Sequence, residues 1–178
     1  MKIAISYPPL ESEKGIPLLG QNRQFQWFNN PTYIYPMVPA YAATLLKSNG
    51  FDVIWNDAIA EEWTYAQYID YYKKSDFDVV MIETKTPVVK MHWEIVKELK
   101  ALKPETVIVM VGDHVTAFSD ETMNNCPVDY VLTGGNYDFL LEHLCENLRE
   151  NKGTVDISKL EAGIYYRQNG VVKNTGKF

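Results

Sequence analysis

The stretch Glu105–Thr116, ETVIVMVGDHVT, decides how the chain is expected to fold. Its β-branched apolar run from Thr106 to Val111 predicts a strand buried on both faces, which is typical of a parallel sheet. The run stops abruptly at Gly112-Asp113-His114. In open parallel sheets, ligands bind beyond the carboxyl ends of the strands. We therefore expect this edge to face a ligand, and Gly112, which has no side chain, would let that ligand approach the backbone.

Strand and helix patterns alternate on either side of this stretch. Strands are expected at 2–7, 51–55, 79–82, 106–111 and 129–132, and helices at 39–48, 64–74, 88–102, 119–125 and 137–149. This order predicts an α/β fold, a flavodoxin-like (Rossmann-like) doubly wound sheet of five parallel strands in the order 2-1-3-4-5. Near the C-terminus, Asn169-Gly170 lies between 162–168 and 171–173 and predicts a β-hairpin. That hairpin either extends the sheet or begins a connection to another domain.

The segment Leu10–Pro36 shows neither a helical nor a strand period. Segments of this length inside a compact domain are usually functional or disordered, and its aromatic content argues against disorder. Its aromatic residues are Phe25, Trp27, Phe28, Tyr33 and Tyr35. They could cover a flat ligand, dock another domain, or pack over the end of the sheet.

Composition limits the classes of function. The 178 residues fit one domain with a small appendage, and the net charge of −6 argues against nucleic acid or an anionic membrane as partner. No apolar run approaches the length of a membrane span, and no signal peptide is visible. Cys126 and Cys145 have no metal-binding or redox spacing, so we expect inert thiols in a reducing cytoplasm.

The predicted strand order places the ligand crevice between the first and third strands. The candidate site residues are those in the loops that follow the strands: Tyr7, Pro8, Pro9, Thr84, Lys85, Thr86, Gly112, Asp113, His114, Val115, Thr116, Thr133, Gly134 and Gly135. These loops offer hydroxyl groups, glycine backbone and apolar rings. They contain no Ser-His-Asp arrangement, no paired carboxylates and no phosphate-binding glycine motif, so we expect no catalysis and no metal site from this chain alone.

Several of these residues have a second interpretation. His114 could contact a cofactor or simply bond loop backbone. Gly112 and Gly134 could clear space for a ligand or form plain strand-end turns. Thr84 and Thr86 could bond a ligand or cap the next helix. Lys85 could meet a phosphate, although pairing with Glu83 is favoured. Asp57 is interpreted as a loop residue, because the glycine fingerprint of dinucleotide binding is missing.

Gly112–Met123, GDHVTAFSDETM, resembles the G-P-H-x-T-x-x-P-E-E-T-L stretch of the cobalamin-binding domain of cobalamin-dependent radical-SAM proteins. It is most similar to the anaerobic magnesium-protoporphyrin monomethyl ester cyclase branch. Similar stretches follow in family order over nearly the whole chain: 5–9, 36–50, 77–84, 128–134 and 163–174. The resemblance implies that the candidate residues bind cobalamin, with its nucleotide tail detached from cobalt (base-off) and no histidine on the metal (His-off).

The chain also departs from the family pattern. Val111-Gly112 replaces a glycine pair, Gly134-Gly135-Asn136-Tyr137 replaces G-E-G-E, and Tyr7-Pro8-Pro9 stands where the methyltransferase branch has its cobalt-ligating Asp-x-His-x-x-Gly. No Cys-x-x-x-Cys-x-x-Cys occurs, so the resemblance implies that the 4Fe-4S cluster and S-adenosylmethionine belong to a radical-SAM domain of the full-length protein. Residues 1–152 would then be the cofactor domain, and 153–178 a hairpin extension leading toward that domain. The alternative is a degenerate, non-catalytic interaction or regulatory module with no bound cofactor.

Overall fold

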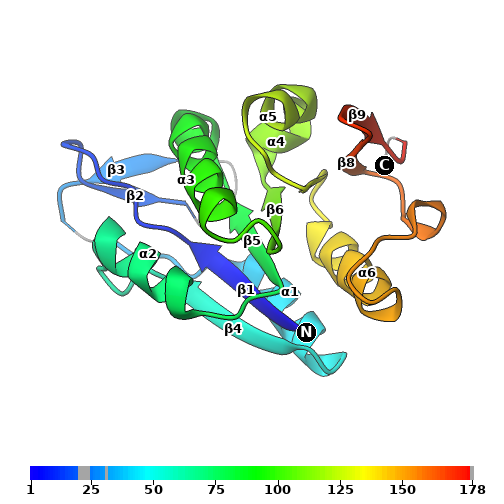
Figure 1. Ribbon diagram of the computed structural model, residues 1–178. Coiled ribbons are helices and arrows are strands. Elements are labelled where there is room, and N and C mark those ends of the chain that lie inside the picture. The colour runs from blue at the N-terminus through cyan, green and yellow to red at the C-terminus, as the bar shows by residue number, and fades with distance from the viewer. Residues whose placement is uncertain (20–24, 31, 177–178) are drawn as a thin grey trace.

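A seven-stranded sheet forms the centre of the computed structural model, which describes residues 1–19, 25–30 and 32–176 (Figure 1). Its five parallel strands lie in the order β4 (Asp52–Asp57), β1 (Lys2–Tyr7), β5 (Val79–Glu83), β6 (Val107–Val111) and β7 (Tyr130–Leu132). Counted along the chain this is 2-1-3-4-5, so the predicted order of the parallel strands is confirmed. The sheet is larger than predicted, because two antiparallel strands continue it.

Those two strands are the predicted C-terminal hairpin, β8 (Ile164–Gln168) and β9 (Val171–Asn174). The turn residues Asn169 and Gly170 have φ angles of 54° and 79°, the left-handed values that an Asn-Gly hairpin turn requires. β8 pairs antiparallel with β7, so the hairpin extends the sheet. Residues 177–178 of the predicted extension lie outside the described residues.

Helices cover both faces of the sheet (Figure 1). One face packs against α2 (Tyr65–Lys74), α3 (Val89–Leu102) and the short helices α4 (Asp113–Ala117) and α5 (Ser119–Asn125). The other packs against α1 (Met37–Ser48) and α6 (Tyr137–Glu150), which also contact each other. Two 3₁₀ turns, η1 (Thr86–Val88) and η2 (Ile157–Lys159), complete the described elements. Among the described residues, no helix has both the length and the apolarity that crossing a bilayer demands.

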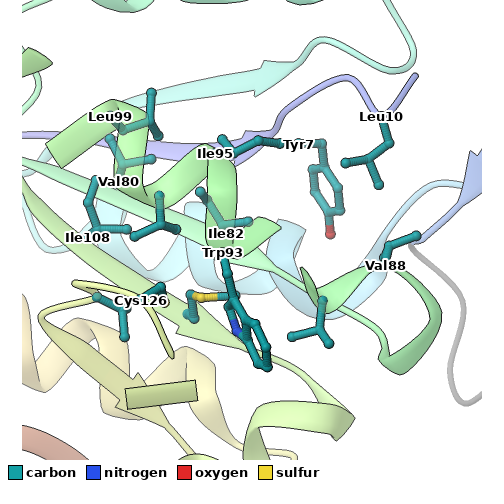
Figure 2. Close-up of a cluster of buried hydrophobic side chains, with 14 of the residues drawn as sticks. Tyr7, Leu10, Val80, Ile82, Val88, Trp93, Ile95, Leu99, Ile108 and Cys126 are labelled. Carbon is teal, nitrogen blue, oxygen red and sulfur yellow. The ribbon is translucent and has the colours of Figure 1, made fainter. Parts of the chain in front are cut away.

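Alternation along the strands divides the core between these two faces. In β5, Val80 and Ile82 join the α2/α3 side, whereas Val79 and Met81 join the α1/α6 side. Figure 2 shows part of the first layer, with Val80, Ile82 and Ile108 of the strands beside Trp93, Ile95 and Leu99 of α3. This two-sided burial explains why the strand sequences are apolar almost throughout.

Two expectations about local structure are wrong. The segment Leu10–Pro36 contains an antiparallel strand pair, β2 (Ile16–Leu18) and β3 (Gln26–Phe28), although parts of the segment, 20–24 and 31, lie outside the described residues. Strands of three residues are too short to show a period, so pattern analysis misses them. The second error is α4, which begins directly after Gly112 and places His114, Val115 and Thr116 on a helix instead of a loop.

Candidate functional site

A cavity of about 290 Å³, here called the central cavity, opens at the carboxyl edge of the sheet between the N-terminal ends of α1 and α6. Its walls come from the segment leading into α1 and from the turns that follow β5, β6 and β7. The lining residues are Ile34, Tyr35, Met37, Val38, Pro39, Glu83, Lys85, Gly112, Asp113, Gly134, Gly135 and Tyr137. Five of them belong to the fourteen candidate site residues: Lys85, Gly112, Asp113, Gly134 and Gly135.

The cavity lies over the ends of β5, β6 and β7, and not between the first and third strands as predicted. No residue of Tyr7-Pro8-Pro9 belongs to its lining among the described residues. Tyr7 closes the predicted crevice, because its ring is buried at the end of β1 and its hydroxyl donates a hydrogen bond to Glu83 Oε2 on β5. A much smaller hollow of about 30 Å³ remains beside Tyr7, with Asp57 in its wall.

Side-chain alternation in β5 decides which residues face the central cavity. Val79 and Met81 pack on the α1/α6 side, and Glu83 and Lys85 continue the same series into the cavity. Thr84, which lies between them, points to the other side, where its Oγ1 lies 2.7 Å from His92 Nδ1. This hydroxyl is buried and bonded within the protein, and it does not serve as the helix cap that was the alternative.

The polar part of the cavity is a small charge cluster. The Glu83 side chain is 8% exposed, and its Oε1 lies 3.6 Å from Lys85 Nζ, so the expected pairing of these two residues is present. Lys85 Nζ also lies 3.2 Å from Asp113 Oδ2 at the more exposed rim. Burial raises the pKa of Glu83, against the opposing effects of the Tyr7 hydrogen bond and the Lys85 charge. Two carboxyl groups thus surround one ammonium group.

Tyr137, the first residue of α6, forms another part of the wall. Its side chain is almost fully buried. Burial, followed by the negative charges of Glu83, Asp138 and Asp113, raises the pKa of its phenol beyond the usual range. The hydroxyl therefore stays protonated and can donate a hydrogen bond.

The glycines at the cavity serve different purposes. A Cβ on Gly112, whose φ is 117°, would lie 2.3 Å from the carbonyl oxygen of Thr84, so the close approach of β5 requires this glycine. A Cβ on Gly134 or Gly135 would meet no atom within 4 Å. These two glycines leave open space in the cavity wall, whereas Gly112 is required by the packing of the fold.

The other candidate residues make contacts within the protein. His114 Nδ1 lies 3.2 Å from Thr86 Oγ1, and its ring packs between Trp93 and Phe118, away from the cavity lining. Thr116 Oγ1 accepts a hydrogen bond from the Gly134 amide, and Thr133 Oγ1 donates one to the Gly163 carbonyl. Pro8, Pro9 and Val115 are buried. Their contacts with a ligand stay predictions.

His92 gives the protein a built-in sensitivity to acid. Burial lowers the pKa of His92 to about 3, whereas an unfolded histidine titrates near ~6.5. The stabilisation by neutral His92 is therefore fully present above the pKa of the unfolded state. It is lost as the pH falls toward the pKa of the folded state. Between pH 7 and pH 5 we expect a loss of about 2 kcal/mol from this group. Urea unfolding at both pH values should show the loss in the wild type and a smaller one in His92→Asn.

The matched control for this prediction is His143→Asn on α6. The His143 side chain is 34% exposed and keeps contact with water. Its replacement should leave the wild-type difference between pH 7 and pH 5 intact. A His92→Asn protein with the full wild-type loss would contradict the assignment.

The aromatic residues of the segment Leu10–Pro36 fill two of the roles expected for them. Phe25 and Trp27 pack edge to face and lie against the buried cluster on the α2/α3 side. Tyr35 is 64% exposed at the cavity mouth and stacks on Trp55 of β4, with ring centroids 5.8 Å apart. The first pair covers the end of the sheet, and Tyr35 offers a flat surface to whatever approaches the mouth.

Seven lining residues are absent from the fourteen candidates, although Tyr35 was named among the aromatic residues that could cover a flat ligand: Ile34, Tyr35, Met37, Val38, Pro39, Glu83 and Tyr137. Glu83 had a readable signal, because alternation from Val79 and Met81 predicts its direction. Tyr137 had one as well, since it starts a helix directly after the Gly134-Gly135 turn. The residues before and inside α1 had no such signal, because their position depends on the path of the long segment.

Known proteins resemble this chain in sequence and in fold. A family model described as the B12 binding domain matches residues 31–139. The uncharacterized methyltransferase PH0819 of Pyrococcus horikoshii is 30% identical over 142 residues, which are 78% of this chain and 29% of the relative.

Two solved structures of the radical S-adenosylmethionine methyltransferase TsrM from Kitasatospora setae are also similar. The one with cobalamin and a [4Fe-4S] cluster bound has a TM-score of 0.71 at 15% identity. The one with tryptophan substrate and a SAM analog has a TM-score of 0.72 at 14% identity. Both alignments cover 98% of this chain and 30% of the TsrM chain, and at such identities they show the fold. The chain thus spans less than a third of the length of these relatives.

Proposed function

Because this chain belongs to the B12-binding domain family, we propose that it holds cobalamin with the nucleotide tail in the central cavity and the corrin ring over the strand ends. The observation that carries this proposal is the position of the cavity at the carboxyl edge of the parallel sheet. Ligands of open α/β sheets bind at this edge.

The residues around the cavity fit such a ligand. A volume of about 290 Å³ can receive a flat base and its sugar, but it is too small for the corrin as well. Ile34, Val38 and Pro39 supply apolar walls, and the Gly134-Gly135 turn leaves open space. The corrin would then lie at the mouth, against the exposed side chains of Tyr35 and Met37. When bound, cobalamin supplies group-transfer chemistry at its cobalt.

Cobalt chemistry also needs a reaction partner. We propose that a radical-SAM domain in the same full-length protein carries the 4Fe-4S cluster and S-adenosylmethionine. The named methyltransferases among the similar proteins, of which this chain spans 29–30%, support such an arrangement. The cyclase-like branch indicated by Gly112–Met123 stays a prediction, and so do the division at residue 152 and the cytoplasmic location.

The placement of the histidines supports a His-off cofactor. None of the three histidines in the sequence belongs to the described cavity lining. His92 is fully buried, His114 faces Thr86, and His143 on α6 bonds the Lys159 carbonyl at the end of η2. With the base in the cavity as well, neither these histidines nor the base would coordinate cobalt.

The electron paramagnetic resonance spectrum of cob(II)alamin bound to this protein tests the base-off, His-off state. We expect no nitrogen superhyperfine splitting, because no nitrogen coordinates the lower face, and an unchanged spectrum in His114→Ala. Nitrogen splitting that disappears in His114→Ala would place this histidine on cobalt. Splitting that persists in the variant would indicate that the base of the nucleotide still coordinates the metal. Either result contradicts the proposed state.

One observation favours a second candidate function. Tyr35 and Met37 are each more than half exposed at the mouth of the cavity, and Phe139 is exposed on α6. Such side chains suit a protein interface as well as a corrin ring. A folded protein that stays colourless with hydroxocobalamin but buries Tyr35 on a partner would support the interaction module instead.

A further inference from the structure

The carboxyl group of Glu83 is the most deeply buried charged group in the described wall of the central cavity, together with its partner Lys85. Tyr7 fixes Oε2 through the hydrogen bond from its hydroxyl. Oε1 has only the longer contact of 3.6 Å with Lys85 Nζ. This oxygen therefore keeps capacity for a further hydrogen bond to a group that enters the cavity.

The surroundings of Glu83 restrict what that group can be. Lys85 is shared between Glu83 and Asp113, so the cluster carries an excess of one carboxyl group. A phosphate placed beside Glu83 would meet like charge in a poorly hydrated place. The apolar side chains of Ile34, Val38 and Pro39 instead suit a flat ring.

A ring nitrogen can form a hydrogen bond with the Glu83 carboxyl group in either of two ways. A protonated nitrogen donates to the carboxylate, or the protonated carboxyl donates to a bare nitrogen. Burial raises the pKa of Glu83, which favours the second form more than it would for an exposed glutamate. A phenolic ring linked through its oxygen has no ring nitrogen and offers Glu83 neither bond.

We infer that Glu83 selects the base at the end of the nucleotide tail and prefers a nitrogen heterocycle, such as a benzimidazole or a purine, over a phenol. This inference rests on the proposed function, because it requires the tail to occupy the central cavity. Glu83 would then be a specificity-determining residue that does not touch the cobalt.

Four dissociation constants test this inference. Cobalamin and the cobamide with a p-cresol base are each titrated into the wild type and into Glu83→Leu. We expect Glu83→Leu to weaken cobalamin about tenfold and to change the p-cresol cobamide less than about twofold, since a hydrogen bond to an ionisable group is lost in one case only. In free cobalamin the base must first detach from cobalt. This free-energy cost is the same for both proteins, so it cancels when each cobamide is compared between them.

Glu94→Leu is the matched control, because Glu94 also pairs with a lysine, Lys97, but lies on α3 with its side chain 72% exposed and is not part of the described cavity lining. It should leave the ratio of the two dissociation constants at the wild-type value. Equal weakening of both cobamides by Glu83→Leu, or of neither, would overturn the inference and leave the proposed function standing. If the wild type binds neither cobamide, the proposed function fails and the inference fails with it.

Glu83→Leu removes the acceptor of the Tyr7 hydroxyl and leaves Lys85 with Asp113 alone, and it could prevent folding. In that case NMR titration measures the binding of two fragments to the wild type, α-ribazole and the riboside of p-cresol. Neither fragment contains cobalt, so no base has to detach from the metal before it binds. We expect α-ribazole to bind about tenfold more tightly. Equal affinities for the two fragments would overturn the inference.

Discussion

Replacing Gly112 by alanine should lower the free energy of unfolding by about 4 kcal/mol, which sums the cost of a backbone conformation open to glycine alone and of a steric overlap. Gly112 has φ 117° and ψ 178°. The added Cβ would lie 2.3 Å from the Thr84 carbonyl oxygen, a backbone atom that cannot move without shifting the end of β5. Urea unfolding followed by circular dichroism measures the loss.

Gly135→Ala is the control for this substitution. Gly135 also lines the central cavity, but it has no positive φ, and a Cβ there meets no atom within 4 Å. The change in stability should stay within about 0.5 kcal/mol, as for other substitutions without steric conflict. If Gly112→Ala were as mild as Gly135→Ala, the close approach of β5 and β6 turns described above would be wrong.

Filling the central cavity should abolish most of the affinity for cobalamin. Val38 lines the cavity from the first turn of α1 and is half-buried, so Val38→Trp places an indole ring where the base of the tail is proposed to bind. We expect the dissociation constant of cobalamin to rise about thirtyfold or more, because the tail can no longer enter. Cobinamide, which lacks the nucleotide, should lose less than about threefold in affinity.

Tyr41→Trp is the matched control for Val38→Trp. Tyr41 also lies on α1, but it is 58% exposed and is not part of the cavity lining. This variant should bind both corrinoids like the wild type. A loss of cobinamide binding as large as that of cobalamin in Val38→Trp would indicate that the tail lies elsewhere.

The fold was predictable because its strands are buried on both faces. The β-branched runs in β5 and β6 have few alternatives to a parallel sheet, and Asn169-Gly170 has few alternatives to a tight hairpin. β2 and β3 were not predictable, because each has only three residues, too few to show the alternation of a strand. The helix α4 was missed because a five-residue helix leaves almost no periodic signal.

The candidate site was predictable at the level of loops and not at the level of side chains. Asp113 and Lys85 face the cavity, whereas their neighbours His114 and Thr84 turn into the protein and bond Thr86 and His92. Thr84 and Lys85 follow the alternation of β5, whereas Asp113 and His114 are consecutive residues of the helix α4, so a loop assignment alone cannot separate them. The helix α1 and the role of Tyr35 were anticipated, but their positions at the cavity were not, since these depend on how the segment before α1 crosses the sheet edge.

Binding of hydroxocobalamin to the folded wild-type protein tests the central claim most directly. The protein is incubated with excess ligand and passed through gel filtration, and the corrin absorbance that travels with it is measured. The account predicts one equivalent of corrin per chain. A protein that elutes colourless, with a circular dichroism spectrum showing the fold intact, would contradict it.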